Sequence, residues 1–222
     1  MSDDVVFLFD VDNTLLDNDA VIADLRQHLV ETFGDASAAH YWEGFEALRT
    51  ELGYADYLGA LQRYRGAGGN DPRLLSISSF LIDYPFPDRL YENSLAALAH
   101  VGRWGPTVIL SDGDVVFQPR KVQRSGLWSA VDGRVLIYIH KEQMLDDMAR
   151  RHPARHYVMV DDKLRILAAM KAALGERLTT VFVRQGHYAF DPEIVRSNPA
   201  ADITIEHIGQ LATVERAMLA PR

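Results

Sequence analysis

Acidic side chains occur in two short clusters, and each cluster follows an apolar run of strand length. Asp10 and Asp12 come after one run, and Asp161 and Asp162 come after another. Because Asp10 and Asp12 are two positions apart at a strand end, both side chains would point the same way. They would then face one small volume with room for a cation and a phosphoryl group. Hard divalent ions such as Mg²⁺ prefer oxygen ligands of this kind.

A hydroxyl and an ammonium group follow two further apolar runs. Ser111, with Asp112 and Gly113 after it, follows the second run of the chain, and Lys141 follows the third. Ligands of an open parallel sheet bind beyond the carboxyl ends of its strands, so we expect these groups to converge with the acidic clusters. Zinc is not expected, because the chain has no cysteine and no histidine pair at ligand spacing.

The elements that must position these groups are apolar runs rich in Val and Ile, as expected of strands buried on both faces. Segments with helical spacing separate most of them, and this alternation predicts a parallel sheet with helices on both faces. The expected strands are residues 5–9, 107–110, 135–139, 157–160, 179–183 and 203–205. The expected helical stripes are Leu90, Leu95, Leu98 and Val101, then Met144, Leu145 and Met148, and finally Leu164, Leu167, Ala168 and Leu174.

One interval breaks the alternation. About 100 residues separate the first expected strand from the second, far more than one crossover helix needs. Apolar residues at helical spacing recur in this interval, which ends in a segment with two prolines, Pro85 and Pro87. We therefore expect an α/β fold with a three-layer Rossmann-like core, residues 1–16 and 88–222, and an inserted α-helical cap, residues 17–87.

Composition limits the class of protein. The 222 residues are 48% hydrophobic and 24% charged, which is typical of a globular chain with a sizeable core. The formal net charge of −8 has the wrong sign for a partner with a phosphate backbone, so no nucleic acid is expected. No apolar run approaches the ~20 residues of a membrane helix, and no basic leader precedes the first strand. We expect a cytoplasmic protein without a membrane partner, a monomer or weak homodimer.

The ordered motifs resemble those of the haloacid dehalogenase superfamily, whose members are mostly phosphatases with an aspartate nucleophile. The Asp-x-Asp-x-Thr motif of that family matches residues 10–14, its Ser or Thr matches Ser111, its lysine best matches Lys141, and its acidic pair matches residues 161–162. The family also has a helical cap between its first and second motifs, where the insert lies. The resemblance spans nearly the whole chain.

The resemblance implies a role for each matched residue. Asp10 would be the nucleophile that attacks phosphorus, and Asp12 would be the acid for the leaving oxygen and then the base for water. Ser111 and the backbone amides around Asp112 and Gly113 would hold phosphate oxygens, and Lys141 would balance charge. Mg²⁺ would be held by Asp10, the backbone carbonyl of Asp12, Asp162 and, directly or through water, Asp161.

The resemblance implies a Mg²⁺-dependent phosphatase acting on a small phosphorylated metabolite. Dehalogenases of the family lack the second aspartate, which this chain retains as Asp12. A phosphomutase of the same superfamily remains an alternative. A receiver-like protein or a non-catalytic phosphate-binding module is less favoured, because receivers have a different motif order and no motif position is lost here. Lys121 and Lys163 also fall near the expected site, so the identity of the active-site lysine stays open.

Other polar and aromatic residues have simpler interpretations. His187 and Tyr188 follow the fifth strand and suit either the rim of the site or a surface loop. Asp17 and Asn18 stand where the first cap helix would begin and are expected to cap it. Arg65 is expected to be solvated. The aromatic residues of the insert, Trp42, Phe45, Tyr57, Tyr64 and Phe80, are expected to form the core of the cap.

Overall fold

A six-stranded parallel sheet forms the centre of the protein. The computed structural model describes residues 3–68 and 71–219. The strands are β1 (Asp3–Phe9), β2 (Thr107–Asp112), β3 (Val135–Tyr138), β4 (Ala154–Asp161), β5 (Leu178–Val183) and β6 (Ile203–Ile205). Their order is β3-β2-β1-β4-β5-β6, and every neighbouring pair is parallel. The predicted α/β class and parallel sheet are confirmed.

The central strands are buried on both faces, which explains their continuous apolar sequences. Every residue from Val5 to Phe9 is at most 1% exposed. Alternate side chains point to opposite faces, so Phe7 and Phe9 join one apolar core, and Val6 and Leu8 join the other.

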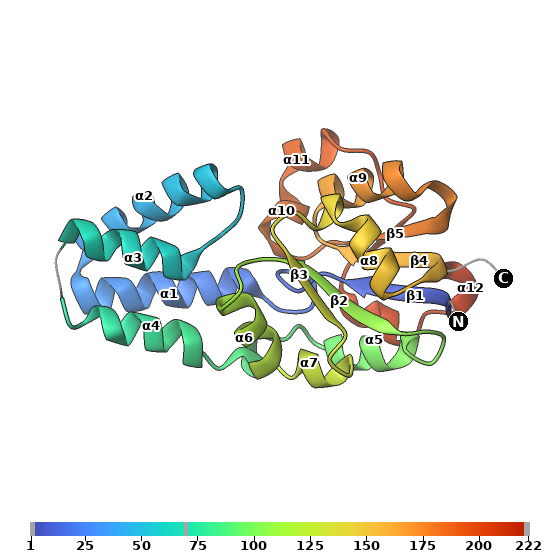
Figure 1. The fold of residues 1–222 in the computed structure, drawn as a ribbon, viewed down its shortest axis with the longest axis horizontal. Helices are drawn as coiled ribbons and strands as arrows, with labels where there is room; N and C mark the ends of the chain where they lie inside the picture. Colours follow the sequence, from blue (N-terminus) through green and yellow to red (C-terminus); the bar gives the residue numbers. More distant parts are fainter. Residues whose placement is uncertain (1–2, 69–70, 220–222) are drawn as a thin grey trace.

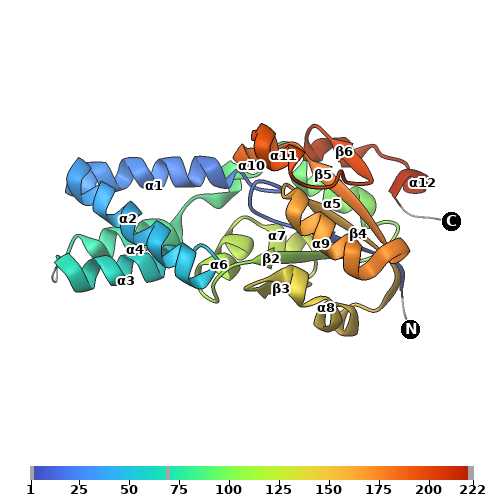
Figure 2. The same cartoon turned by 90° about the horizontal axis from the view of Figure 1, so that it is seen from above.

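Helices cover both faces of the sheet (Figures 1 and 2). The core with Phe7 includes residues of α5 (Ser94–Val101), α6 (Phe117–Arg124), α7 (Leu127–Ala130), η4 (Ile208–Ala212) and α12 (Arg216–Leu219). The core with Val6 includes residues of α8 (Leu145–Arg151), α9 (Leu164–Leu174) and α10 (Gly186–Phe190). The remaining short elements are η1 (Phe86–Arg89), η2 (Lys141–Gln143), η3 (Gly175–Arg177) and α11 (Pro192–Arg196). The molecule thus has the predicted three layers.

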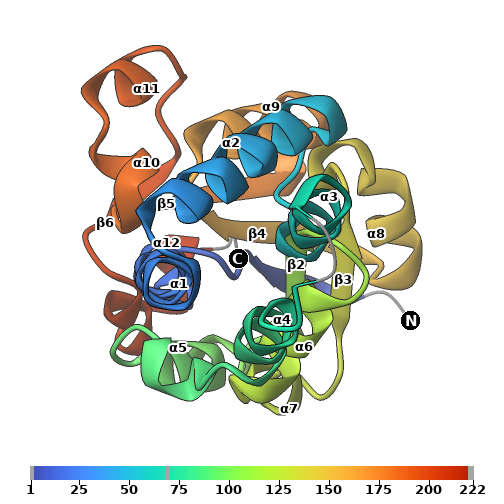
Figure 3. The ribbon, with the colours of Figure 1, turned by 90° about the vertical axis from the view of Figure 1, so that its left-hand side faces the viewer.

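Four of the helices between β1 and β2 in the sequence gather at one end of the molecule (Figures 1 and 3). We call them the cap: α1 (Asn18–Phe33), α2 (Asp35–Leu52), α3 (Tyr57–Gly68) and α4 (Leu74–Asp83). Aromatic rings hold α2 and α3 together, since Phe45 stacks on Tyr57 with ring centroids 4.8 Å apart. The chain division at residues 17 and 87 stays a prediction.

Several expected boundaries differ from those observed. β2 and β4 continue to Asp112 and Asp161, because these residues still pair with β3 and β5. Leu90 does not belong to a helix; it forms an isolated bridge with Leu16, and α5 begins only after Asn93, whose φ of 64° interrupts a helix.

Two stripe residues also lie outside the apolar cores. Leu95 is 43% exposed, and Met144 precedes α8 and is 38% exposed.

No helix within residues 3–68 and 71–219 is both long and apolar enough to cross a membrane.

Candidate active site

A buried lysine joins the ends of the two central strands. Lys141 Nζ lies 2.6 Å from Asp10 Oδ1, which follows β1, and 2.7 Å from Asp161 Oδ2, the last residue of β4. The backbone carbonyl of Leu110 accepts a further hydrogen bond from Nζ at 3.2 Å. All three charged residues are at most 2% exposed. The sheet order explains this meeting, because β1 lies between β2 and β4 and Lys141 follows β3, beyond β2.

The pKa values at this cluster are set by opposing effects. Burial disfavours the ionised form of Asp10, but the charges of Lys141 and Lys163 more than offset it and lower the pKa of Asp10. Burial also opposes the charge of Lys141, yet the carboxylates of Asp10 and Asp161 raise its pKa overall. For Asp161 the effect of burial prevails, and its pKa is raised. The cluster therefore holds an ionised Asp10 beside a protonated lysine.

Asp162 extends the cluster of buried carboxylates. Its backbone N–H donates to Thr14 Oγ1 at 3.1 Å, which ties the end of β4 to the loop after β1. Neither carboxylate oxygen of Asp162 has a hydrogen-bond partner in the part of the chain that the structure describes, and the same holds for the buried Oδ2 of Asp10. Burial raises the pKa of Asp162 well above its ordinary value. One carboxylate oxygen from each of Asp10, Asp161 and Asp162 lies within 4.8 Å of the others.

The end of β2 supplies a hydroxyl group beside Asp10. Ser111 Oγ donates to Asp10 Oδ1 at 3.2 Å and accepts from Gln118 Nε2 at 3.1 Å. Asp112 Oδ1 accepts from the backbone N–H of Lys141 at 2.7 Å, and burial raises the pKa of Asp112 to about 6. A Cβ on Gly113 would lie 2.6 Å from Gln118 Cβ, so this tight approach requires glycine.

The carboxylate of Asp12 turns away from the Asp10 cluster. Lys121 Nζ, from α6, lies 2.6 Å from Asp12 Oδ1 and also donates to Asn18 Oδ1 at 2.9 Å. The side chain of Asp12 is 25% exposed, whereas that of Lys121 is fully buried. Of the four predicted metal-binding residues, Asp10, Asp161 and Asp162 therefore bring their side-chain oxygens together, and the carboxylate of Asp12 is not part of this group.

Three lysines were candidates for the active-site lysine, and each occupies a different place. Lys141 contacts Asp10, and Lys121 contacts Asp12. Lys163 lies close enough to Asp162 and Asp10 that their charges raise its pKa, although burial opposes this.

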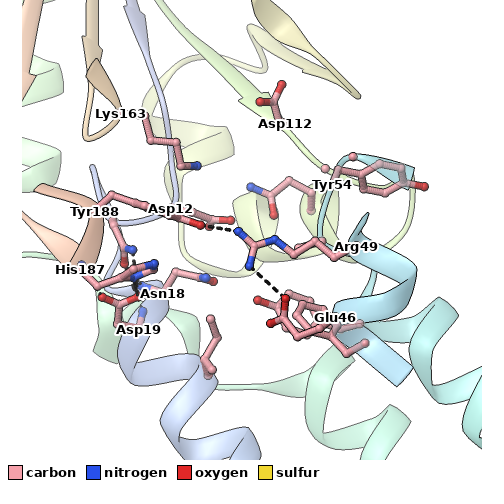
Figure 4. Close-up of a pocket in the computed structure, with 18 of the residues that line it drawn as sticks. Asp12, Asn18, Asp19, Glu46, Arg49, Tyr54, Asp112, Lys163, His187 and Tyr188 are labelled. Atoms are coloured by element: carbon pink, nitrogen blue, oxygen red, sulfur yellow. Dashed lines mark hydrogen bonds and ion pairs between the residues drawn. The ribbon is translucent and has the colours of Figure 1, made fainter. Parts of the chain in front are cut away.

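A cavity of about 700 Å³ lies between the carboxyl ends of the strands and the cap. Figure 4 shows Asp12, Asp112 and Lys163 on the core side and Arg49 and Glu46 on the cap side. Three aromatic residues expected only in the cap core also line this cavity, namely Trp42, Phe45 and Tyr57. Tyr64 and Phe80 do not line it, and they contact other rings of the cap.

Contacts between cap and core form the rim of the cavity. Asp19 of α1 accepts from the backbone N–H of His187 at 2.8 Å, and its other oxygen lies 2.7 Å from His187 Nδ1. Arg49 of α2 donates to the hydroxyl of Tyr188 and lies 3.5 Å from Glu46 (Figure 4). His187 and Tyr188 therefore lie at the rim, one of two places that the sequence allowed.

Several cap residues at the cavity were not predicted. Asp19, Glu46 and Arg49 carry no motif, and only their places on the cap helices bring them to the cavity. Asp17 behaves as predicted and caps α1, since its side chain accepts from Ala20 N at 2.9 Å. Asn18 does not cap the helix; its side chain binds Lys121 instead. Arg65 is exposed, as predicted, and it also has an interaction partner.

Comparisons with known proteins find similarity only among solved structures. No protein-family model matches the chain, and no curated protein matches it. A crystal structure from Burkholderia xenovorans LB400, assigned as a haloacid dehalogenase-like hydrolase, is 69% identical, with a TM-score of 0.92 over 96% of this chain and 99% of that one.

Two more distant structures share the fold alone. The hydrolase YfnB of Bacillus subtilis, solved with magnesium bound, is 16% identical, with a TM-score of 0.60 over 95% of this chain and 97% of that one. The L-2-haloacid dehalogenase of Xanthobacter autotrophicus is 18% identical, with a TM-score of 0.60 over 96% of this chain and 97% of that one.

Proposed function

Because the chain belongs to the haloacid dehalogenase-like hydrolases, we propose that it hydrolyses a small phosphate monoester, with Asp10 as the nucleophile and Mg²⁺ as the cofactor. The observation that carries this proposal is the buried cluster of Asp10, Lys141, Asp161 and Asp162. It combines a carboxylate held ionised, a lysine beside it and buried carboxylate oxygens that accept no hydrogen bond from the described residues.

The donor set fits a magnesium ion. The three carboxylates supply only oxygen, which Mg²⁺ prefers. Asp162 and Asp161 are buried with raised pKa values, and a bound cation would stabilise their ionised forms. Asp10, Asp161 and Asp162 would hold the ion together with the backbone carbonyl of Asp12. When bound, Mg²⁺ supplies positive charge that offsets the repulsion between Asp10 and a phosphate dianion.

The size of that repulsion explains why the site needs its cations. Two like charges ~4 Å apart repel by about 4 kcal/mol at an effective dielectric constant of ~20. Lys141 supplies one compensating charge at 2.6 Å from Asp10. Ser111, which already donates to Asp10, is also placed to donate to a phosphate oxygen. The carboxylate of Asp10 would then attack phosphorus and become an aspartyl phosphate.

Asp12 has the position expected of the proton-transfer group. It follows Asp10 by two residues, it lines the cavity, and its carboxylate is not part of the carboxylate cluster. In this proposal Asp12 donates a proton to the leaving oxygen and, in the second step, accepts a proton from the attacking water. The cap lines one side of the cavity and would limit the access of bulk water to the first step.

A dehalogenase is the main competing activity, because L-2-haloacid dehalogenases share this fold. Asp12 favours the phosphatase. A departing halide needs no proton, and the dehalogenases that the chain resembles lack this aspartate. A phosphomutase would retain Asp12 and would return the phosphoryl group to a substrate hydroxyl.

One assay separates these activities. Purified protein is incubated with a panel of phosphate monoesters, with and without Mg²⁺, and inorganic phosphate is measured. We expect release that requires both Mg²⁺ and Asp10, so Asp10→Asn is the control variant. Halide release from 2-haloacids without phosphate release would overturn the proposal in favour of a dehalogenase. Accumulation of an isomeric phosphate ester would indicate a phosphomutase.

We also propose that the partner is a small phosphorylated metabolite, since the cavity of about 700 Å³ would enclose a ligand of that size.

A further inference from the structure

Lys121 is a buried charge that the proposed reaction leaves without a role. Its side chain is fully buried, its Nζ lies 2.6 Å from Asp12 Oδ1, and Asn18 Oδ1 accepts its other hydrogen bond at 2.9 Å. We propose that Lys121 is the positioning residue for Asp12: it holds one carboxylate oxygen so that the other faces the leaving group. This inference rests on the proposed phosphatase function.

Packing alone does not explain a lysine here. Removing an ammonium group from water costs several kcal/mol, and an apolar side chain of similar length would fill the same space among Phe117 and its neighbours. The ammonium group lies 5.0 Å from the centroid of the Phe117 ring, so its surroundings are partly apolar. The role of a charge in such an environment therefore lies in its contacts with Asp12 and Asn18.

The hydrogen bond distinguishes the two oxygens of Asp12. Oδ1 is held by Lys121, and no other residue in 3–68 and 71–219 hydrogen-bonds or ion-pairs with this carboxylate. Asp12 lines the cavity, and a quarter of its side chain is exposed. Oδ2 is therefore the atom that can exchange a proton with a bound molecule.

The proton balance follows from this division. In the first step, the bond from phosphorus to the leaving oxygen breaks as Asp10 bonds to phosphorus, and the proton on Asp12 Oδ2 passes to the leaving oxygen. In the second step, water attacks phosphorus, the bond to Asp10 breaks, and a proton of the water returns to Oδ2. Lys121 keeps its own protons throughout and fixes the direction of Asp12.

Asn18 connects this arrangement to the cap. It is the first residue of α1, and its backbone N–H donates to Asn13 Oδ1 at 3.0 Å. The Lys121 ammonium group thus bridges the loop that carries Asp12 and the start of the cap.

Leaving groups that differ in their need for a proton provide the test. Phenyl phosphate and p-nitrophenyl phosphate have similar shapes, but phenolate leaves far less readily without a proton than p-nitrophenolate does. In Lys121→Met, we expect kcat/KM for phenyl phosphate to fall about 10- to 100-fold, and that for p-nitrophenyl phosphate to fall at most about threefold. In Lys171→Met, which removes a lysine 2.9 Å from Asp202, both values should stay unchanged.

The double variant with Asp12→Asn separates positioning from a general structural effect. If Lys121 acts through Asp12, adding Lys121→Met to Asp12→Asn lowers kcat/KM for phenyl phosphate no further. Equal losses for both esters in Lys121→Met, or a further loss in the double variant, would overturn the inference. If Lys121→Met does not fold, Asn18→Ala removes the second partner of Lys121, and a selective loss of about two- to fivefold for phenyl phosphate is expected; an unselective effect would contradict the inference.

If the proposed phosphatase function is wrong, the result differs from the one expected when only the inference on Lys121 is wrong. Wild-type protein would then release phosphate from no ester, whereas failure of this inference leaves wild-type hydrolysis intact and removes only the selectivity of the variants.

Discussion

Lys141 Nζ lies 2.6 Å from Asp10 Oδ1, although 131 positions separate the two residues in the chain. The same ammonium group contacts Asp161, so one buried cation balances two buried carboxylates. Removal of this cation has consequences for both stability and activity.

Lys141→Met should destabilise the metal-free protein at pH 7 by about 3 kcal/mol, because two buried carboxylates lose their counter-charge. Phosphate release should fall by about 100-fold or more, because Asp10 loses a charge that offsets repulsion. Urea unfolding and steady-state rates measure the two effects. Lys171→Met is the matched control, and its partly exposed ion pair should be worth less than about 1 kcal/mol. Equal stability of the two variants would contradict the assignment.

Asp162→Asn should have the opposite effect on stability. Neither carboxylate oxygen accepts a hydrogen bond from residues 3–68 and 71–219, and the effect of burial, which raises the pKa of Asp162, outweighs that of the nearby charge of Lys163. The ionised form therefore costs folding free energy at neutral pH without metal, and a neutral amide of the same shape removes that cost. We expect an unchanged or higher melting temperature without metal.

The same variant should bind magnesium more weakly. The concentration of Mg²⁺ that gives half of the thermal stabilisation should rise by about tenfold or more, since one lost charge pair exceeds 1.4 kcal/mol at short range. Asp146→Asn, an exposed substitution in α8, serves as the control. A normal response to Mg²⁺ in Asp162→Asn would exclude Asp162 as a ligand.

Asp202 should contribute stability that disappears in acid. Burial opposes its charge, but hydrogen bonds from Thr180 and Lys171 lower its pKa overall. A pKa lower in the folded than in the unfolded state contributes stability above the unfolded value, about 4, which is lost as the pH falls through the folded value. Asp202→Asn should therefore be less stable than wild type at pH 7, and the difference should shrink below about pH 4. Urea unfolding midpoints of both proteins across this pH range test the prediction. A difference in stability that does not change with pH would contradict it.

Gly186 should be required by its close approach to Asn13. Its φ is +68°, and a Cβ there would lie 2.4 Å from the Asn13 Cβ. Gly126 has a similar φ of +87°, but no atom of the described residues lies within 4 Å of such a Cβ. Gly126→Ala should cost about 1 kcal/mol from backbone strain alone, and Gly186→Ala should cost about 2 kcal/mol more, because the loop after β5 must move away. Calorimetry of both variants measures the difference; equal losses would show that the contact contributes nothing.

Much of the fold follows from local patterns. The runs of Val and Ile that predict strands are long and apolar because both faces of β1 and β4 are buried. Boundaries were less predictable, as at Leu90, where Asn93 with positive φ delays the helix that the apolar spacing indicates. Strand ends at Asp112 and Asp161 depend on pairing with neighbours that the local sequence does not contain.

The sequence by itself determined which side chains stand at the carboxyl ends of the strands, because strand length and hydrophobicity are local properties. It left open which lysine meets which carboxylate. Only the tertiary structure placed Lys141 against Asp10 and Lys121 against Asp12, since a long side chain can reach several groups and packing selects one. The cap residues Asp19 and Arg49 likewise reach His187 and Tyr188 through the packing of distant helices, which no spacing along the chain encodes.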